Sequence, residues 1–403
     1  MQKQPVFKNE FIALMASLMS IVALSIDALL PALPDIAKHL TILEPEKSQQ
    51  LITMIFLGLG FGQLLFGPLS DSFGRKPMVY IGFTIFVTAS FVCVNTTSFE
   101  IMLVGRIFQG IGLSSPRTIS IAMIRDAFSG NFMAKVLSLV VMFFILVPIV
   151  APTLGQLLLH LFSWKAIFYA NVIFGILIMI WFYLRQPETL SKEKRIPFSL
   201  YLFYSGTKEF LKHKEAIAFT LTSGFITGSF MVYLSTSQQI FQEQYQLGEM
   251  FPYVFASTAF AVGFSTFANS RFVIQFGAYN IAFYATIAYF SISFLYVLLF
   301  YSSNNPNLLV VMLFFLLQFF AVGFLFGNYR SLAMQPLGHI AGIGAAINGF
   351  VSTVMAVPIA NYIGAFVSTS VLPLFIGFSV FGFLSLLVFM YLQKTKKKIL
   401  VKV

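Results

Sequence analysis

Charged side chains are scarce in this chain of 403 residues. Asp, Glu, Lys and Arg together make up 10% of it, while 58% of the residues are hydrophobic. A soluble domain has about 25% charged residues, because its surface has to be solvated by water. The scarcity of charge therefore argues against a soluble enzyme or nucleic-acid-binding protein, and the hydrophobic content excludes a disordered chain. The composition predicts an integral membrane protein.

Cysteine is nearly absent as well. Cys93 is the single cysteine, which excludes a disulfide framework and a CxxC metal site. The four histidines stand near the ends of hydrophobic runs or between them, and no two have the spacing of a metal site. The sequence also has no P-loop and no nucleophile–base arrangement, so it offers no residues for an ATP-driven pump or a membrane enzyme. We expect no metal and no cofactor.

Long hydrophobic runs are abundant. A bilayer core about 30 Å thick needs about 20 apolar residues per helix. Twelve runs of that length predict twelve transmembrane helices in two six-helix bundles, an all-α membrane fold. The first run is too long for a cleavable signal peptide. The predicted spans are residues 11–33, 48–68, 78–96, 101–124, 135–160, 164–184, 215–237, 250–270, 278–302, 308–328, 341–364 and 370–392.

The longest polar stretch divides the chain into equal halves. It covers residues 185–214 and contains seven basic residues. We therefore expect an N-terminal bundle (1–184), a cytoplasmic linker (185–214) and a C-terminal bundle with a basic tail (215–403). Equal halves joined by a charged loop are typical of duplicated transporter folds, in which the substrate site lies between the halves.

The basic residues predict the orientation of the chain. With both termini in the cytoplasm, twenty of the 25 Lys and Arg residues are cytoplasmic, two lie within spans, and only Lys38, Lys47 and Lys165 lie outside. Basic loops stay on the cytoplasmic side, so this bias explains the net charge of +11 without a nucleic-acid partner. The tail lysines between 394 and 402 are expected at the lipid surface, with a partner site as the alternative.

A glycine-rich motif joins the second and third predicted spans. It reads Gly67-Pro-Leu-Ser-Asp71-Ser-Phe-Gly74-Arg75-Lys-Pro. Gly67 and Gly74 permit a tight connection and close helix approach. Asp71 can accept hydrogen bonds from the amides at a helix N-terminus, and Arg75 can bridge to a neighbouring carboxylate.

This motif resembles the GxxxDxxGRKP signature of the major facilitator superfamily, except that Ser72 stands where a basic residue is usual. The resemblance implies a loop that locks the cytoplasmic side in the outward-facing state; a plain turn that retains positive charge in the cytoplasm is the alternative. Further segments resemble the Bcr/CflA group of drug:proton antiporters. They are residues 25–34 (SIDALLPALP), 62–63 (GQ), 125–126 (RD), 151–155 (APTLG), 164–168 (WKAIF), 269–271 (NSR) and 333–342 (AMQPLGHIAG).

The fifth predicted span carries two prolines and a glycine. Pro148 and Pro152 each remove a backbone hydrogen bond and Gly155 removes a side chain, so this helix can bend and approach a neighbour closely. In the family, an APxxG stretch here is typical of exporters, which favours efflux. Kinked packing without directional meaning is the alternative.

Asp27 is the only acidic residue well inside a predicted span. Ionisable groups at that depth are costly and usually functional. Arg106 lies at a similar depth, because each is about six residues, or about 9 Å, from the outer end of its span. We hypothesise an ion pair that forms when Asp27 is ionised and opens when it is protonated; a purely structural pair is the alternative. Residues 106–112 also resemble the superfamily's RxxQG element, which is implicated in proton transfer.

Four further polar residues in apolar helices are candidate substrate contacts. Arg117 follows Arg106 by eleven residues, so both side chains point nearly the same way. Arg117 either lines the inner cavity, where it favours anionic or neutral substrates, or pairs with a helix C-terminus. Gln109, Tyr233 and Gln238 are the other candidates, and for each a satisfied hydrogen bond between helices is equally open.

The residues and the resemblance together predict a proton-coupled secondary transporter that exports drugs or other small amphipathic molecules by antiport. Its partners are protons, the substrate and membrane lipids, and it is expected to work as a monomer in a bacterial inner membrane. A dedicated exporter of an endogenous metabolite, such as a siderophore, amino acid or sugar, is one alternative. A sensor or scaffold that transports nothing is another, although the carboxyl of Asp27 inside a span argues against it.

Overall fold

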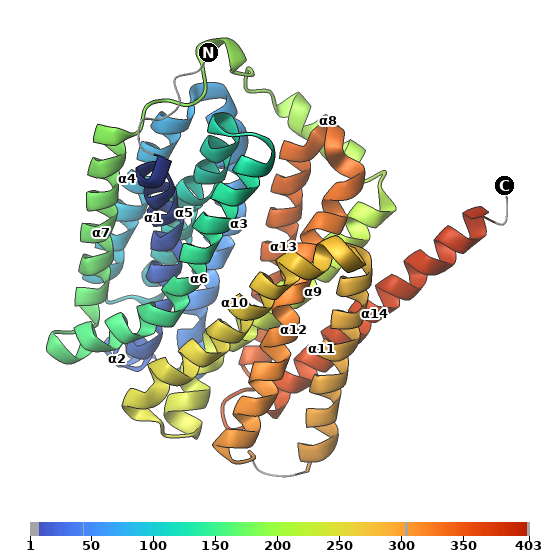
Figure 1. Cartoon of the computed structure of the whole chain (residues 1–403). Coiled ribbons are helices and arrows are strands. Elements are labelled where there is room, and N and C mark those ends of the chain that lie inside the picture. Colours follow the sequence, from blue (N-terminus) through green and yellow to red (C-terminus); the bar gives the residue numbers. More distant parts are fainter. Residues whose placement is uncertain (1–7, 43, 303–304, 401–403) are drawn as a thin grey trace. The chain divides into compact units, whose positions relative to one another are not determined.

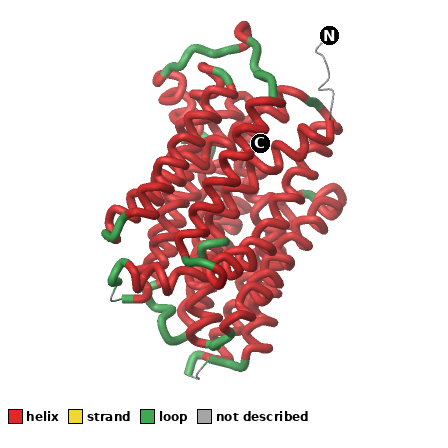
Figure 2. The backbone as a smooth tube through the Cα atoms, turned by 90° about the vertical axis from the view of Figure 1, so that its left-hand side faces the viewer, coloured by secondary structure: helices red, strands yellow, loops and turns green. Residues whose placement is uncertain are grey.

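The computed structural model describes residues 8–42, 44–302 and 305–400, and all regular structure within these ranges is helical (Figures 1 and 2). This confirms the all-α fold class. Two helices are short, α2 (Leu33–His39) and α8 (Leu200–Phe210). Twelve helices in the described ranges have twenty residues or more. They are α1 (Lys8–Asp27), α3 (Gln50–Phe73), α4 (Arg75–Asn95), α5 (Phe99–Ala127), α6 (Gly130–Leu161), α7 (Trp164–Arg185), α9 (Lys214–Gln238), α10 (Phe251–Phe276), α11 (Ala278–Phe300), α12 (Leu308–Met334), α13 (Ala341–Gly364) and α14 (Leu372–Leu400).

Eleven segments of the described chain are long and apolar enough to cross a membrane, and α5 is the one long helix outside this set. Its 29 residues include Arg106, Arg117 and Arg125, which interrupt the apolar run. At 1.5 Å per residue, α5 is about 43 Å long, more than the bilayer core needs. Twelve long helices agree with the twelve spans predicted from the sequence.

The helices extend further than the hydrophobic runs. The stretch between the second and third predicted spans, residues 69–77, is almost entirely helical, because α3 continues to Phe73 and α4 begins at Arg75. Gly74 alone makes the turn, with a φ of 105° that side chains other than glycine rarely tolerate. Polar residues thus end the apolar run without ending the helix.

The contacts of the chain define two compact units. The first comprises Met1–Leu200 with Glu249–Ala256. Within it, α5 packs against α3, α4 and α1, and α1 also packs against α6 and α7. The backbones of α3 and α5 touch, because a Cβ atom on Gly110 would lie 2.0 Å from the carbonyl oxygen of Ile55. Small residues at such crossings allow transmembrane helices to pack closely.

The second unit comprises Tyr201–Gly248 with Ser257–Val403. Here α9 packs against α12, α13 and α14, and α11 packs against α12 and α14. Helix α8 belongs to this unit: Gly206 faces the side chain of Ile343, and Phe210 is buried in a cluster with Leu337. The boundaries predicted for the bundles, at residues 184 and 215, stay predictions. Of the basic residues used to predict orientation, Lys3 and Lys402 lie outside the described residues.

Candidate functional site

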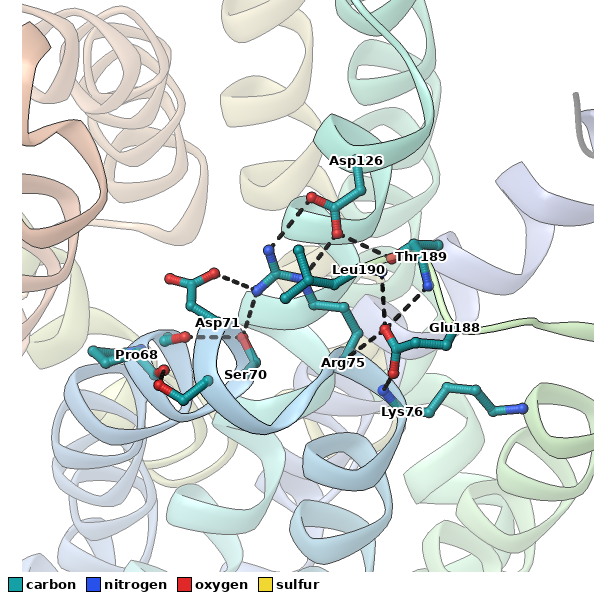
Figure 3. Close-up of polar contacts among 11 residues, drawn as sticks. Pro68, Ser70, Asp71, Arg75, Lys76, Asp126, Glu188, Thr189 and Leu190 are labelled. Carbon is teal, nitrogen blue, oxygen red and sulfur yellow. Dashed lines mark hydrogen bonds and ion pairs between the residues drawn. The ribbon is translucent and has the colours of Figure 1, made fainter. Parts of the chain in front are cut away.

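Arg75, the first residue of α4, is the centre of a polar network at the turn between α3 and α4 (Figure 3). Its side chain is buried and carries two ion pairs. Nε donates to Oδ2 of Asp126 at 2.9 Å, and Nη1 donates to Oδ1 of Asp71 at 2.6 Å. Nη1 also donates to the hydroxyl of Ser70 at 2.8 Å. One guanidinium therefore joins α3, α4 and the end of α5, and the carboxylate bridge predicted for Arg75 is present.

Glu188 caps the N-terminus of α4. Its Oε1 accepts a hydrogen bond from the backbone amide of Arg75 at 3.0 Å, and its Oε2 accepts one from the amide of Lys76 at 3.0 Å. The first amides of a helix have no partner within the helix, and a carboxylate there is favoured by the helix dipole. The sequence predicts Asp71 as an acceptor for helix-terminal amides. For the amides of α4 the structure has Glu188 in that role, because the Asp71 carboxylate accepts from Arg75.

The segment that follows α7 lies over this turn. Glu188 Oε1 also accepts from the amides of Thr189 and Leu190 at 3.0 Å, and the Thr189 hydroxyl donates to Asp126 at 3.0 Å. The amide of Ile196 donates to the carbonyl of Asp71 at 3.2 Å. The first part of the predicted linker is therefore fixed to the first unit. In the sequence, the acidic Glu188 and the hydroxyl residue Thr189 directly follow Pro187. A count of charged residues does not single them out.

The two glycines of the motif differ in their surroundings. A Cβ atom on Gly74 would lie 2.8 Å from Nη2 of Arg195 and 2.9 Å from Oε2 of Glu188, and both of these side-chain ends could shift to make room. Glycine is required here by its φ of 105°. Gly67 lies within α3, and a Cβ atom there would meet no atom within 4 Å. Among the described residues of the first unit, no helix approaches Gly67 closely, and the close approach expected there stays a prediction. The tight connection is made by Gly74.

Asp27 and Arg106 are both buried, with 4% and 1% of their surface exposed. Asp27 is the last residue of α1 and Arg106 lies in α5. Within the described ranges they form no ion pair with each other, and the Asp27 carboxyl has no hydrogen-bond partner. Arg106 Nε instead donates to the carbonyl of Leu51 at 2.8 Å, and both Nη atoms lie 3.4 Å from the carbonyl of Ser25. The arginine is thus held by backbone oxygens of α1 and α3.

The candidate substrate contacts have other partners. Gln109 accepts from Arg106 Nη1 at 2.9 Å and donates to Ser90 at 2.6 Å. The Tyr233 hydroxyl and that of Thr258 share a hydrogen bond of 2.6 Å. Gln109 and Tyr233 therefore make the bonds between helices that the sequence left open as the alternative.

The other two candidates are Gln238 and Arg117. The side chain of Gln238, at the end of α9, donates to Glu243 at 3.2 Å. Glu243 belongs to the π-helical segment Gln239–Gln244 that follows α9. Arg117 is half-buried in α5, one residue beyond Pro116. As substrate contacts, all four candidates stay predictions.

Helix α6 contains Pro148 and Pro152 and contacts α1 near Asp27. A Cβ atom on Gly155 would lie 1.9 Å from the carbonyl oxygen of Ala28, the residue that follows Asp27. The backbones of the two helices therefore touch at this point. The APTLG stretch and the only acid predicted well inside a span are thus neighbours in the first unit, a proximity that their separation in the sequence does not reveal.

Residues 15–360 match the sequence profile of the Major Facilitator Superfamily. A bicyclomycin resistance protein homolog from Haemophilus influenzae is 32% identical over 269 residues, covering 66% of this chain and 67% of that protein. The multidrug resistance protein MdtL of Klebsiella pneumoniae is 26% identical and covers 87% of each chain. The resemblances stated from the sequence are confirmed.

Solved structures share the fold. The xylose transporter XylE from E. coli, in a partially occluded inward-open conformation, has a TM-score of 0.71 at 14% identity and covers 96% of this chain and 98% of its own. The human organic anion transporter MFSD10 has a TM-score of 0.67 at 18% identity and covers 94% of this chain and 98% of its own. At these identities the likeness concerns the fold alone.

Proposed function

Because the chain belongs to the major facilitator superfamily, we propose that it is a proton-coupled antiporter that exports drugs or other small amphipathic molecules. The coarser part of this function follows from the family and the relatives: the chain is a multi-pass membrane protein and a secondary transporter of small molecules, not an enzyme. The relatives named for bicyclomycin and multidrug resistance support drugs as substrates.

The observation that carries the proposal is the buried carboxyl of Asp27, on the helix whose Ser25 carbonyl is reached by the guanidinium of Arg106. Arg106 donates hydrogen bonds to the carbonyls of Leu51 and Ser25. This is the arrangement that the hypothesis expects when Asp27 carries a proton, because an ionised carboxylate at this depth would need a cation or hydrogen-bond donors. Loss of the proton would draw the carboxylate and the guanidinium together.

The cycle follows from the two states of this pair. Asp27 takes up a proton from the outside and releases Arg106, the two six-helix halves change their conformation, and the proton leaves toward the cytoplasm. Substrate and proton favour different states, so that one outgoing substrate exchanges for one or more incoming protons. The contact between Ala28 and Gly155 gives α6 a direct mechanical link to the proton site.

The network around Arg75 is the proposed cytoplasmic lock. Its place at the α3–α4 turn fits a bacterial inner membrane protein with both termini in the cytoplasm, which is also the orientation favoured by the basic residues. Asp71, Arg75 and Asp126 would hold the ends of three helices together in one state of the cycle. In this proposal, residues 185–214 separate the two halves, and the protein works as a monomer.

The test is drug transport in inside-out membrane vesicles with an acidic interior. Bicyclomycin and a panel of uncharged and cationic drugs are added, and proton release from the vesicles is followed with a pH-sensitive dye. The native chain should release protons on addition of a substrate, and Asp27→Asn should abolish the release. Asp35→Asn is the matched control, because Asp35 is an exposed acid in α2.

Two results would count against the proposal. Transport by Asp27→Asn with its dependence on pH intact would refute the coupling role of Asp27 while leaving the transporter assignment in place. No movement of any drug by the native chain would refute drug export and favour the metabolite exporter.

A further inference from the structure

The first unit contains a groove between α1, α6 and α7, with a volume of about 660 Å³. This is within the range of small-molecule binding sites. On α6 its lining runs from Phe143 to Leu158, a length of about 22 Å. The groove is therefore large enough for a drug-sized molecule and lies wholly within one unit.

Small side chains on α1 create this space. Ala13, Ala16, Ser17 and Ser20 line the groove from α1. On the opposite side, aliphatic side chains of α6 such as Leu154 remain 44% exposed, so they do not fill the space that the small residues leave. A close-packed helix pair would have buried these side chains.

Asn171 of α7 faces the groove without a hydrogen-bond partner. Only 6% of its surface is exposed, and it lines the groove, yet none of the described residues bonds to its side-chain amide. Two other buried asparagines are satisfied: Asn328 donates to Asn269, and Asn348 donates to Thr220. A buried amide without a partner is costly, so Asn171 calls for a ligand group that hydrogen-bonds to it.

The depth of Asn171 indicates the kind of ligand. It lies seven residues from Trp164, where α7 begins, which places it about 10 Å inside the helix end. Tryptophan favours the membrane interface, where the ester groups of phospholipids also lie. A lipid acyl chain has no hydrogen-bonding group 10 Å deeper, whereas a small amphipathic molecule carries such groups within its apolar body. No charged side chain lines the groove in the described residues, so a charged ligand would find no counter-ion.

We propose that this groove binds the uncharged, mostly apolar substrates of the transporter, with one hydrogen-bonding group of the ligand facing Asn171. This inference rests on the proposed function and names the substrate class for one of its sites. The groove extends along α1 as far as Ala28, the residue that contacts Gly155. Ser17 and Ser20 supply further hydroxyls on the opposite wall.

The test is equilibrium binding of tritiated progesterone to the purified full-length protein by scintillation proximity. Progesterone is uncharged, mostly apolar and carries carbonyl oxygens that can accept from the Asn171 amide. Unlabelled progesterone defines the saturable part of the signal. Asn171→Leu should weaken saturable binding about fivefold, the effect of one lost hydrogen bond. Ala170→Phe should fill the groove and weaken binding tenfold or more. Ile173→Phe is the control, because Ile173 is 59% exposed on the same helix and does not line the groove.

Unchanged affinity in both Asn171→Leu and Ala170→Phe, with folding verified by size-exclusion chromatography, would refute the site. Loss of a co-purified phospholipid from Ala170→Phe, detected by native mass spectrometry while progesterone binding persists, would also refute it by assigning the groove to lipid. Binding is measured without a proton gradient and should survive Asp27→Asn. A failure of proton-coupled export with intact, groove-dependent binding would therefore contradict the proposed function alone.

Discussion

Replacing Glu188 by glutamine should loosen the start of α4. The carboxylate of Glu188 accepts four backbone hydrogen bonds, from the amides of Arg75, Lys76, Thr189 and Leu190. Glutamine keeps one acceptor oxygen and turns the other position into a donor, which faces N–H groups. It also removes the negative charge at the N-terminus of α4.

The size of the effect follows from these contacts. The four amides lose charge-assisted hydrogen bonds, each of which is stronger than a neutral one. The N-terminus of α4 also loses a favourable negative charge, which is worth about 0.3–1 kcal/mol. We expect a local loss of about 2 kcal/mol in the free energy of opening at this turn. Because 1.4 kcal/mol corresponds to a factor of ten, the amides at the start of α4 should exchange about 30-fold faster.

Hydrogen–deuterium exchange with mass spectrometry measures this directly in the peptide that begins at Gly74. Glu193→Gln is the matched control, because Glu193 lies in the same segment and is exposed, and no hydrogen bond or ion pair among the described residues links it to α4. Faster exchange at residues 75–76 in Glu188→Gln alone would support the reasoning. Equal exchange in the two variants and the native chain would refute the capping role of Glu188.

Three further predictions concern single positions. Gly155→Val should lower the melting temperature and the folded yield sharply, because its Cβ would overlap the Ala28 carbonyl. Gly67→Ala should be neutral or stabilising by up to about 1 kcal/mol, because its Cβ would meet no atom within 4 Å. Equal melting temperatures of the two variants would contradict this prediction. Arg75→Lys should lose most of the stability of the network, because an ammonium cannot hold two carboxylates in the fork geometry of a guanidinium; native-like thermal stability and exchange would argue otherwise. Burial raises the pKa of Tyr245, which lies between α9 and α10, to about 12. The folded chain therefore loses this proton at a higher pH than the unfolded chain does. The stability that the protonated Tyr245 contributes is fully present below about pH 10 and is lost as the pH rises toward 12. Tyr245→Phe should remove this part of the alkaline destabilisation, and a native chain with the same alkaline stability as the variant would contradict it.

The ion pair predicted between Asp27 and Arg106 shows that equal depth in the membrane does not establish contact between two side chains. Depth along two helices places the residues at one level, and the structure buries both. Depth cannot give the rotation of each helix about its axis, which decides whether the side chains touch. In the structure the guanidinium reaches the carbonyl of Ser25 on the helix of Asp27 instead of its carboxyl. Backbone oxygens compete for an arginine, and no sequence pattern reveals which of them is within reach.

The sequence by itself determined the membrane class, the number of long helices, the family and the carboxylate bridge of Arg75. These follow from features that act locally or along one helix: the length of an apolar run, the side on which basic residues gather, and a short motif at one turn. Only the tertiary structure decided that Glu188 caps α4, that Gly155 touches Ala28, and that Asn171 faces a groove without a partner. Each of these features depends on residues that are far apart in the chain and are brought together by packing. The surroundings of a buried group, and therefore the energy of burying it, are set by that packing and not by the neighbouring residues in the sequence.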